Sequence, residues 1–240
     1  MKIIEAIKQR NEDLRAKPVT IAFLGDSVTQ GCFECYKTEQ GLDTIFDYKS
    51  AYSTRVKEML NFLYPRAQIN IINSGISGDG AYWGSVRVER DVLEYNPDLV
   101  VVSYGLNDST HGRENLDNYR NLLEQIFEKI SKRNIETIFL TQNYMNTKTS
   151  VHLQDDVSIS LSKEFAEKIQ NPGVLKNYFE VAKKACEKWN VTVCDLYSWW
   201  ETLEGAGVDV TELLANKLNH PVREMHYYTA IKLIETMLTK

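Results

Sequence analysis

Ser27 is the first residue of this chain whose surroundings suggest chemistry. It ends the triplet Gly25-Asp26-Ser27, which follows an apolar run over Val19–Leu24. An apolar run rich in β-branched and aromatic residues and followed by Gly is typical of a buried strand that ends in a tight turn. A serine hydroxyl at such a turn is a candidate nucleophile, and a helix N-terminus behind it would offer backbone N–H groups to an oxyanion. The same residues are also ordinary turn and helix N-cap residues, so the triplet alone supports both interpretations.

Two later loops carry groups that could assist a nucleophile. Three glycines lie in the loop over residues 73–80, and they indicate a close backbone approach or a positive φ angle. The Gly78 N–H is therefore free to face a ligand. Asn107 follows the apolar run Leu99–Ser103 and can present a side-chain amide N–H at the same edge as Ser27. The alternative role of Asn107 is to form an Asx turn.

The histidine best placed to act as a base is His220. It precedes Pro221, and a residue before proline is biased away from the helical region, so His220 is expected on a loop. A histidine on a loop at a sheet edge can take a proton from a serine. His226 ranks second, because it begins a helix and could be a cap or a packed side chain. His111 and His152 lie in loops after the third and fourth strands, where either could line the cleft.

The elements that must position these groups alternate along the chain. Apolar runs predict five strands, and helical spacing of apolar residues predicts the helices between them. Such alternation is typical of a parallel sheet with helices on both faces, which binds ligands at the carboxyl ends of its strands. We expect strands over Val19–Leu24, Gln68–Ile72, Leu99–Ser103, Ile135–Leu140 and Val191–Cys194, and helices over residues 3–15, 51–63, 85–94, 116–130, 174–189 and 223–238.

Two long segments between these elements are expected to be irregular. The first runs from Gly31 to about Lys49 and contains several aromatic residues, which suit a wall or lid over the cleft or the anchoring of a long loop. The second runs from Thr141 to about Ser160, is polar, and is expected to cross the cleft. No repeat, low-complexity tract or linker divides the chain. Residues 1–240 are therefore expected to form one domain, with residues 1–17 as a helix packed on it.

The composition is that of an ordinary soluble globular protein, with 240 residues, 43% hydrophobic and 25% charged. The net charge of −5 combines interspersed charges of both signs, so no basic face favours nucleic acid as a partner. The charged segment Met1–Lys17 lacks the apolar core of a signal peptide, and no apolar run is long enough to span a bilayer. We expect a cytoplasmic protein without a membrane span, whose oligomeric state is left open.

The four cysteines give little support to a metal or redox site. Cys32 and Cys35 form a C-x-x-C pair, but no second pair stands at zinc-ribbon spacing. Reduced thiols are the expectation for an intracellular protein, with a metal or redox role as the alternative. The glycine-rich loop lacks the lysine of a phosphate loop and the spacing of a dinucleotide fingerprint. No metal and no cofactor is therefore predicted.

Together, four stretches resemble the sequence blocks of the GDSL or SGNH hydrolase family. Ser27 matches the first block within Gly25-Asp26-Ser27, Gly78 the second, Asn107 the third within residues 105–108, and His220 the last within residues 219–221. The blocks keep the family's order over residues 21–221. The resemblance implies a flavodoxin-like three-layer α/β/α sandwich with a five-stranded parallel sheet, and ester hydrolysis through an acyl-serine intermediate.

The resemblance also implies a role for each of the four residues. Ser27 attacks the ester carbonyl, and His220 takes its proton and later returns it to the leaving alcohol. The backbone N–H groups of Ser27 and Gly78 and the side-chain amide of Asn107 hold the oxyanion. Activity is then expected to fall on acidification through the ordinary histidine pKa of about 6.5.

One position departs from the family's pattern. The family usually has an aspartate three residues before the catalytic histidine, and this chain has Lys217 there. Asn216, Asp209 or a backbone carbonyl are the alternatives for the group that orients the imidazole of His220. An amide or a carbonyl can orient the ring, although neither carries the full charge that stabilises an imidazolium.

The leading hypothesis is a serine esterase that removes acetyl or short acyl groups from a small or carbohydrate-linked ester. Tyr82, Trp83, Trp199 and Trp200 would suit a sugar ring, with buried packing as the expected role of the last two. The alternatives are a lysophospholipase or acyl-thioesterase, which needs an apolar acyl groove, and a non-catalytic binding domain that keeps the fold. An α/β-hydrolase elbow is not indicated, because Thr29 stands where its second glycine would be.

Overall fold

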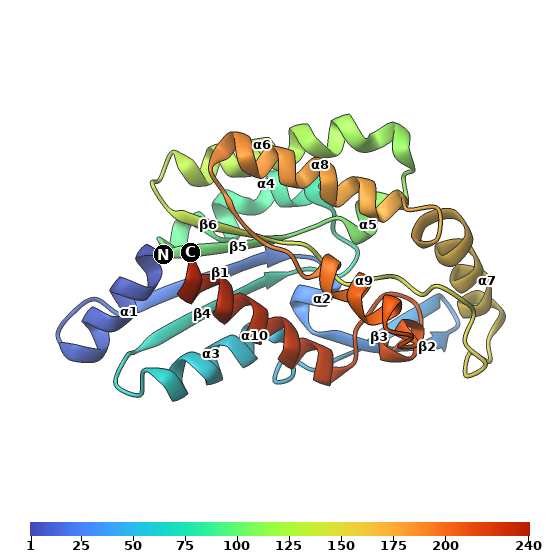
Figure 1. Cartoon of the computed structure of the whole chain (residues 1–240), viewed down its shortest axis with the longest axis horizontal. Coiled ribbons are helices and arrows are strands. Elements are labelled where there is room, and N and C mark those ends of the chain that lie inside the picture. Colours follow the sequence, from blue (N-terminus) through green and yellow to red (C-terminus); the bar gives the residue numbers. More distant parts are fainter.

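The computed structural model describes residues 1–240, and its centre is a parallel sheet of five strands (Figure 1). These strands are β1 (Val19–Gly25), β4 (Ile69–Gly75), β5 (Leu99–Ser103), β6 (Glu136–Leu140) and β7 (Thr192–Cys194). They lie in the order β4-β1-β5-β6-β7. In chain order this is second, first, third, fourth, fifth, which is the flavodoxin-like arrangement. All five predicted strands and the predicted sheet are therefore confirmed.

Helices cover both faces of the sheet (Figure 1). One face is covered by α4 (Ala81–Asp91), α6 (Leu116–Ser131) and α8 (Val174–Trp189), and the other by α1 (Lys2–Glu12), α3 (Tyr52–Leu63) and α10 (Arg223–Thr239). Each buries one apolar stripe; that of α8 includes Leu175, Tyr178, Ala182 and Cys186 at helical spacing. The predicted three-layer sandwich is confirmed. No helix has both the length and the apolar composition that crossing a membrane requires.

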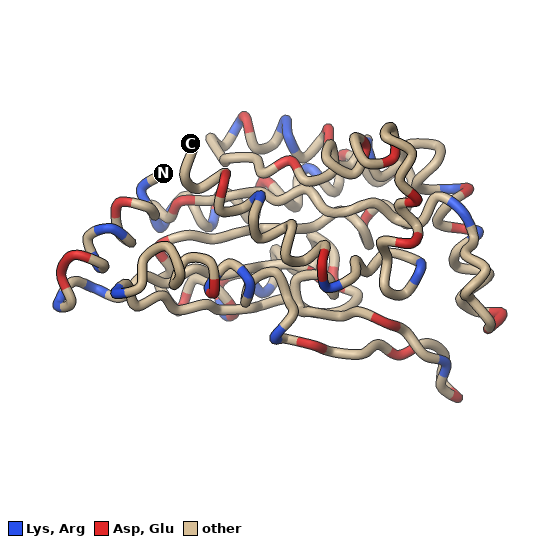
Figure 2. The backbone as a smooth tube through the Cα atoms, turned by 60° about the horizontal axis from the view of Figure 1, so that its bottom comes forward, with Lys and Arg blue, Asp and Glu red and all other residues tan.

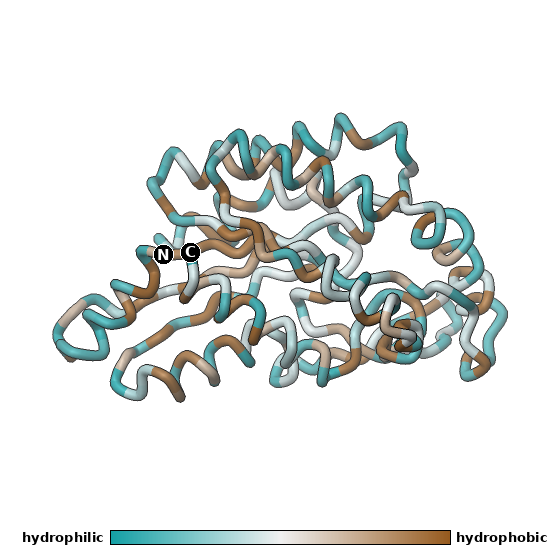
Figure 3. The backbone as a smooth tube through the Cα atoms, viewed as in Figure 1, coloured by the Kyte–Doolittle hydropathy of each residue, from teal (hydrophilic) through white to brown (hydrophobic).

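The centre of the core lies in β1 and β5. Every residue of β5 is buried, and in β1 only Thr20 retains partial exposure. Strands covered on both faces form continuous apolar runs instead of alternating ones, which is why their sequences locate them so well. Figure 3 shows the hydrophobic colouring concentrated in these central strands. Figure 2 shows acidic and basic residues interspersed along the outer elements.

The N-terminal helix α1 belongs to the same hydrophobic core. Its Ile3, Ile4 and Ile7 are buried with the strand residues. The carboxylate of Glu136, at the start of β6, accepts hydrogen bonds from the backbone N–H groups of Lys2 and Ile3 at 3.1 and 2.9 Å. A carboxylate at a helix N-terminus satisfies free N–H groups and complements the helix dipole. These contacts hold α1 on the domain.

Residues 31–49 depart from the expected irregular loop. They contain an antiparallel hairpin made of β2 (Cys32–Thr38) and β3 (Gly41–Phe46), with Thr38 paired to Gly41. The two residues of the turn are Glu39 and Gln40, which are not the Asn-Gly or Asp-Gly residues that usually identify a tight hairpin. Burial along both strands does not alternate cleanly either. Both sequence signals of a hairpin are therefore weak in this segment.

The segment after β6 also contains more regular structure than expected. It is irregular through Asp155, and then α7 (Asp156–Glu164) begins, with the Asp155 side chain accepting the Ser158 N–H at 2.8 Å. A π-helix over Phe165–Gln170 follows directly. The remaining elements are α2 (Ser27–Gln30), α5 (Leu106–Ser109), α9 (Tyr197–Gly205) and the short 3-10 helices Leu93–Tyr95, Arg113–Asn115 and Val210–Leu213.

The ends of three neighbouring strands are level at the carboxyl edge of the sheet. Gly25, the last residue of β1, lies opposite Gly75 of β4 on one side and Ser103 of β5 on the other. The chain order reverses between β1 and β5, and doubly wound sheets bind ligands outside such a reversal. The helices α2 and α5 begin just after β1 and β5, so the residues that follow these strands share one edge.

Candidate active site

Ser27 and His220 meet at this edge although they lie 193 positions apart in the sequence. The Nε2 atom of His220 lies 3.0 Å from the Oγ atom of Ser27. Ser27 begins α2, and Asp26 caps this helix by accepting a hydrogen bond from the Val28 N–H at 3.0 Å. The capping role and the placement of the hydroxyl therefore belong to adjacent residues of the same turn. Ser27 is 4% and His220 6% exposed, so both lie below the surface of the edge.

The group that orients the His220 ring is the backbone carbonyl of Phe33, in β2. The Nδ1 atom of His220 lies 3.0 Å from this oxygen. A carbonyl oxygen only accepts hydrogen bonds, so Nδ1 carries the proton and Nε2 accepts from the Ser27 hydroxyl. Burial lowers the pKa of His220 to about 4, and the hydrogen bond to Phe33 opposes this shift. The imidazole is therefore neutral at pH 7, and its pKa lies well below the ordinary value that the sequence led us to expect.

The other candidates for the orienting group have different roles. The Oδ1 atom of Asn216 accepts hydrogen bonds from the backbone N–H groups of residues 218–220, at 2.9 to 3.0 Å. Asn216 thus shapes the loop that carries His220 without touching the ring. Asp209 pairs with Lys148 at the surface, 2.6 Å apart. Lys217, in the position where the family usually has aspartate, has a φ of 58° and pairs with a glutamate at 2.8 Å.

Arg223 holds the hairpin that supplies the Phe33 carbonyl. It is the first residue of α10, and its guanidinium donates to Glu34 at 2.6 Å and to Asp47 at 2.9 Å. The guanidinium carbon also lies 4.3 Å from the centroid of the Phe33 ring. These contacts join β2, and the residue that directly follows β3, to the helix that follows His220. They fix the carbonyl relative to the imidazole.

The remaining histidines do not contact Ser27. His226 is buried, and its Nδ1 accepts the Tyr52 N–H at 3.1 Å, as the packed alternative predicts. Burial lowers the pKa of His226 to about 3. His111 lines a surface hollow beside the edge, while His152 is exposed.

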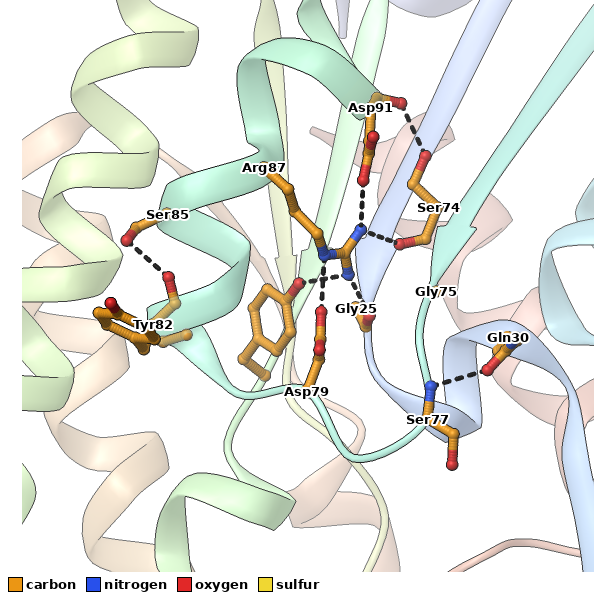
Figure 4. A network of polar contacts seen from close by, with 12 residues as sticks. Gly25, Gln30, Ser74, Gly75, Ser77, Asp79, Tyr82, Ser85, Arg87 and Asp91 are labelled. Atoms are coloured by element: carbon orange, nitrogen blue, oxygen red, sulfur yellow. Dashed lines mark hydrogen bonds and ion pairs between the residues drawn. The ribbon is translucent and has the colours of Figure 1, made fainter. Parts of the chain in front are cut away.

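Gly78 lies in the loop that follows β4, and Asn107 lies in α5, which follows β5; these two strands flank β1, the strand that leads to Ser27. The Nδ2 atom of Asn107 donates to the backbone carbonyl of Asp79 at 2.7 Å and keeps a second N–H for a ligand. Gly78 has a φ of 82°, which favours glycine, and its N–H donates no hydrogen bond within the chain. The Ser77 N–H donates to the Gln30 side chain at 2.7 Å, which ties this loop to α2 (Figure 4).

Gln142 is a residue of the site that the sequence did not suggest. It lies two positions after the end of β6 and is 2% exposed. Its Nε2 donates to Asp26 at 2.8 Å, and its Oε1 accepts the Leu106 N–H at 2.9 Å. One amide thus joins the Ser27 turn to the start of the helix that carries Asn107. Its position just beyond a strand end was the only sequence signal for this role.

Two buried carboxyl groups lie behind the site. Burial raises the pKa of Asp26 to about 7, against the hydrogen bonds from Gln142 and Val28. Burial likewise raises the pKa of Asp108 to about 6. The Asp108 Oδ1 accepts the Ala81 N–H at 2.9 Å and so caps the start of α4. Both carboxyl groups shape the backbone around the candidate residues.

A polar hollow of about 560 Å³ opens beside Gly78 and Asn107. The exposed rings of Tyr82 and Trp83 form one side of it, with centroids 5.2 Å apart in an edge-to-face arrangement. The other lining residues are mostly polar: Gly80, Asp108, His111, Glu114, Asn115, Asn118 and Leu122. The tryptophan pair at 199 and 200 packs instead, since Trp200 is fully buried.

An apolar groove of about 630 Å³ lies elsewhere, between the C-terminal halves of α3 and α10. Its lining includes Met59, Phe62, Tyr227, Ile231 and Leu238, and none of the four candidate residues. Both helices run back from the carboxyl edge, so this groove is remote from Ser27 (Figure 1).

The cysteines are free thiols. Burial raises the pKa of Cys32 to about 11, which keeps it protonated at neutral pH. The Sγ atom of Cys35 accepts a hydrogen bond from Asn216 at 3.5 Å. No group of three or more His, Cys, Asp or Glu side chains is arranged to hold a metal ion.

Known structures share this fold over most of the chain. The lipase/acylhydrolase from Enterococcus faecalis aligns with 91% of this chain and 95% of its own, with a TM-score of 0.69 and 20% identity. An acetyl xylan esterase aligns with 90% of this chain and 98% of its own, with a TM-score of 0.65 and 22% identity. A two-domain esterase active on acetylated mannans aligns with 98% of this chain, with a TM-score of 0.70 and 19% identity, and this chain covers 52% of it.

Sequence comparisons extend the likeness from fold to family. An acetylxylan esterase from Geobacillus stearothermophilus is 32% identical over 89 residues, which are 37% of this chain and 39% of that relative. The alignment therefore spans well under half of either protein. The model of the GDSL-like lipase/acylhydrolase family matches residues 23–227, which include all four candidate residues. The chain belongs to the GDSL-like lipase/acylhydrolase family, a family of carboxylic ester hydrolases.

Proposed function

We propose that this protein is a serine esterase that removes acetyl or other short acyl groups from carbohydrates. The observation that carries the proposal is the 3.0 Å contact between Ser27 Oγ and His220 Nε2, with Nδ1 occupied by the Phe33 carbonyl. A neutral imidazole in this tautomer has a free lone pair facing the hydroxyl. That is the arrangement a general base requires.

The proposed reaction has two steps. Ser27 Oγ attacks the ester carbonyl carbon while its proton passes to His220 Nε2, and the imidazolium then gives this proton to the departing alcohol. Water repeats the sequence on the acyl-serine, with His220 again taking and returning the proton. The negative oxygen formed in each step accepts hydrogen bonds from the Ser27 and Gly78 N–H groups and from Asn107 Nδ2.

The Phe33 carbonyl replaces the usual aspartate in this scheme. It fixes the tautomer and the ring plane, but it carries only the partial negative charge of a dipole. The low pKa of His220 agrees with the replacement of the aspartate by a carbonyl, because no neighbouring carboxylate raises this pKa. The proposal therefore assigns catalysis to a Ser27–His220 dyad oriented by the backbone.

The surroundings of the dyad favour a sugar ester over a long acyl chain. The hollow next to Gly78 and Asn107 has polar side chains for hydroxyl groups, and Tyr82 and Trp83 offer aromatic faces to a sugar ring. The apolar groove that a lysophospholipase or acyl-thioesterase would need lies away from these residues. The relatives named above, esterases of acetylated xylan and mannan, support the same substrate class.

A substrate panel tests this proposal. We expect hydrolysis of p-nitrophenyl acetate and of acetylated xylo- and manno-oligosaccharides, with rates that fall steeply from acetate to octanoate esters. Ser27→Ala should lower kcat by about 10⁴-fold or more. Ser131 is an exposed serine at the end of α6, and Ser131→Ala should match the native protein.

Hydrolysis by Ser27→Ala at the native rate would overturn the mechanism. A folded native protein with no activity on any ester would favour a binding domain, and a preference for long acyl chains would favour the lipid or thioester alternatives.

A further inference from the structure

We infer that Arg87 is the positioning residue of the oxyanion-binding groups: its buried guanidinium holds together the three strand ends that carry Ser27, Gly78 and Asn107. Nothing in the sequence marks this residue, which looks like one of many charges on a surface helix. The inference rests on the proposed function, because it assigns a role within the same site.

All five N–H groups of the guanidinium have acceptors (Figure 4). Nε donates to the Asp79 carboxylate at 2.6 Å. Nη1 donates to the Ser74 carbonyl at 2.6 Å and to Asp91 at 3.3 Å. Nη2 donates to the Gly25 carbonyl and to the Tyr104 hydroxyl, both at 2.9 Å. The Arg87 side chain is 5% exposed, so water does not compete for these positions.

Three of the five acceptors stand shortly before an oxyanion-binding group in the sequence. Gly25 is the last residue of β1 and stands two positions before Ser27. Ser74 lies at the end of β4, from which the loop containing Gly78 departs. Tyr104 follows β5 and stands three positions before Asn107. One planar cation thus fixes the mutual spacing of three strand ends.

A fourth acceptor, Asp79, links the cation to the Asn107 amide, while the fifth, Asp91, lies at the end of α4 itself. Asp79 uses its carboxylate for Arg87 and its backbone carbonyl for Asn107 Nδ2, at 2.7 Å. A shift of the Asp79 backbone away from Arg87 would strain the ion pair and also move the carbonyl that aims the amide. Asp79 adjoins Gly78, so the same movement displaces the Gly78 N–H. Arg87 therefore acts on both donors through a single residue.

The packing of α4 leaves room for this arrangement. Gly84 faces the Tyr104 ring so closely that a Cβ at this position would collide with it. The absence of a side chain lets the Tyr104 ring lie against α4 and bring its hydroxyl to Nη2. Lysine could not replace Arg87 here, because an ammonium offers three donors around a point and cannot span acceptors on three strands.

A double-mutant cycle tests the inference. Arg87→Lys should lower kcat on p-nitrophenyl acetate by about 10- to 100-fold with little change in KM, since small displacements of oxyanion donors affect the transition state most. In an Asn107→Ala background the same substitution should cost less, about 3- to 10-fold, because it can then displace only the Ser27 and Gly78 N–H groups. Arg133→Lys, an exposed arginine paired with Glu89 of α4, should stay within about 2-fold in both backgrounds.

The double-mutant cycle can also overturn the inference. Equal losses from Arg87→Lys in the native and Asn107→Ala backgrounds would show a structural role only and overturn the inference. If Arg87→Lys does not fold, Tyr104→Phe removes one acceptor while keeping the ring, and the same coupling is expected at a smaller magnitude. Native protein without any ester hydrolysis would overturn the proposed function instead. In that case the side-chain ¹⁵N amide signal of Asn107 reports the positioning, and it should broaden or shift in Arg87→Lys but not in Arg133→Lys.

Discussion

Two arginines hold the two sides of this site, and they work in different surroundings. Arg87 is 5% exposed and fixes the side that would bind the oxyanion. Arg223 has a side chain that is 36% exposed and fixes the hairpin that orients His220. Arg87 donates mostly to backbone and buried groups, whereas Arg223 pairs with Glu34 and Asp47 in contact with solvent.

The difference shows what each side requires. Oxyanion donors must be placed within fractions of an ångström, and a saturated guanidinium away from water provides such a fixed geometry. A general base tolerates more freedom, because its hydrogen bond to the serine guides the ring. Ion pairs in contact with water are weak and are screened by salt. We therefore expect the oxyanion side to be sensitive to single substitutions and the histidine side to be sensitive to conditions.

Among substitutions that leave Ser27 and His220 in place, the largest effect is expected on the oxyanion side. Asn107→Ala should lower kcat by about 10²- to 10³-fold, because it removes one donor to the oxyanion, and should leave KM nearly unchanged. Steady-state kinetics with p-nitrophenyl acetate measure this split. The exposed Asn118 of the same hollow is the matched control, and Asn118→Ala should retain native kcat on this small substrate. A loss confined to KM would assign Asn107 to substrate binding only.

The dependence of kcat/KM on pH tests the histidine side of the site. Burial lowers the pKa of His220 to about 4, and only the neutral ring can act as base, so kcat/KM should fall about tenfold per pH unit below that value. Activity should persist at pH 5.5, where an ordinary histidine would be mostly protonated. An inflection between pH 6 and 7 that disappears in Asp26→Asn belongs to that carboxyl group. Asp108, whose pKa burial raises to about 6, is the second carboxyl group to replace. A fall in kcat/KM near pH 6.5 that survives both Asp26→Asn and Asp108→Asn would contradict the low pKa of the buried base.

Arg223→Met should separate the two sides. Loosening the hairpin should lower kcat by about 3- to 10-fold and admit water to His220, so that its pKa rises from about 4 toward the ordinary value. Arg87→Lys should lower kcat without moving the pH at which protonation of His220 reduces kcat/KM. The pH profiles of kcat/KM for the two variants show whether the pKa of His220 moves in one and not in the other. Identical profiles would mean that the two arginines do not serve separate sides.

The smallest effect is expected at the aromatic edge of the hollow. Trp83→Ala should raise KM for acetylated oligosaccharides by about 3- to 10-fold, because it removes one face that a sugar ring can contact. Its kinetics on p-nitrophenyl acetate should stay native, since this substrate has no sugar. Tyr95→Ala, an exposed aromatic outside the hollow, serves as the control. An equal loss on both substrates would remove the hollow from sugar binding.

Much of the scaffold could be predicted because its physics is local. The strands β1 and β5 are buried on both faces, so their apolar runs identify them without any long-range information. Parallel strands end at one edge, and this rule predicts that Ser27 and Asn107, which follow the neighbouring strands β1 and β5, share that edge. Proline after His220 correctly indicated a loop. The strands of the fold and the loop that carries His220 therefore followed from patterns within a few residues.

The features of the site that the sequence did not predict depend on contacts between distant segments of the chain. The Phe33 carbonyl orients His220, but every residue has a carbonyl, so no residue type could identify it. The hairpin that presents it lacks the usual turn residues. Arg87 and Gln142 resemble surface or loop residues until the fold brings several acceptors around them. Buried polar networks of this kind become visible only in three dimensions.

The dyad of Ser27 and His220 is the centre of this account, and covalent labelling tests it most directly. Incubation with a fluorophosphonate followed by peptide mass spectrometry should give a single adduct on Ser27, and His220→Ala should label far more slowly. Folded protein that remains unlabelled, or that carries the adduct on another residue, would contradict the account.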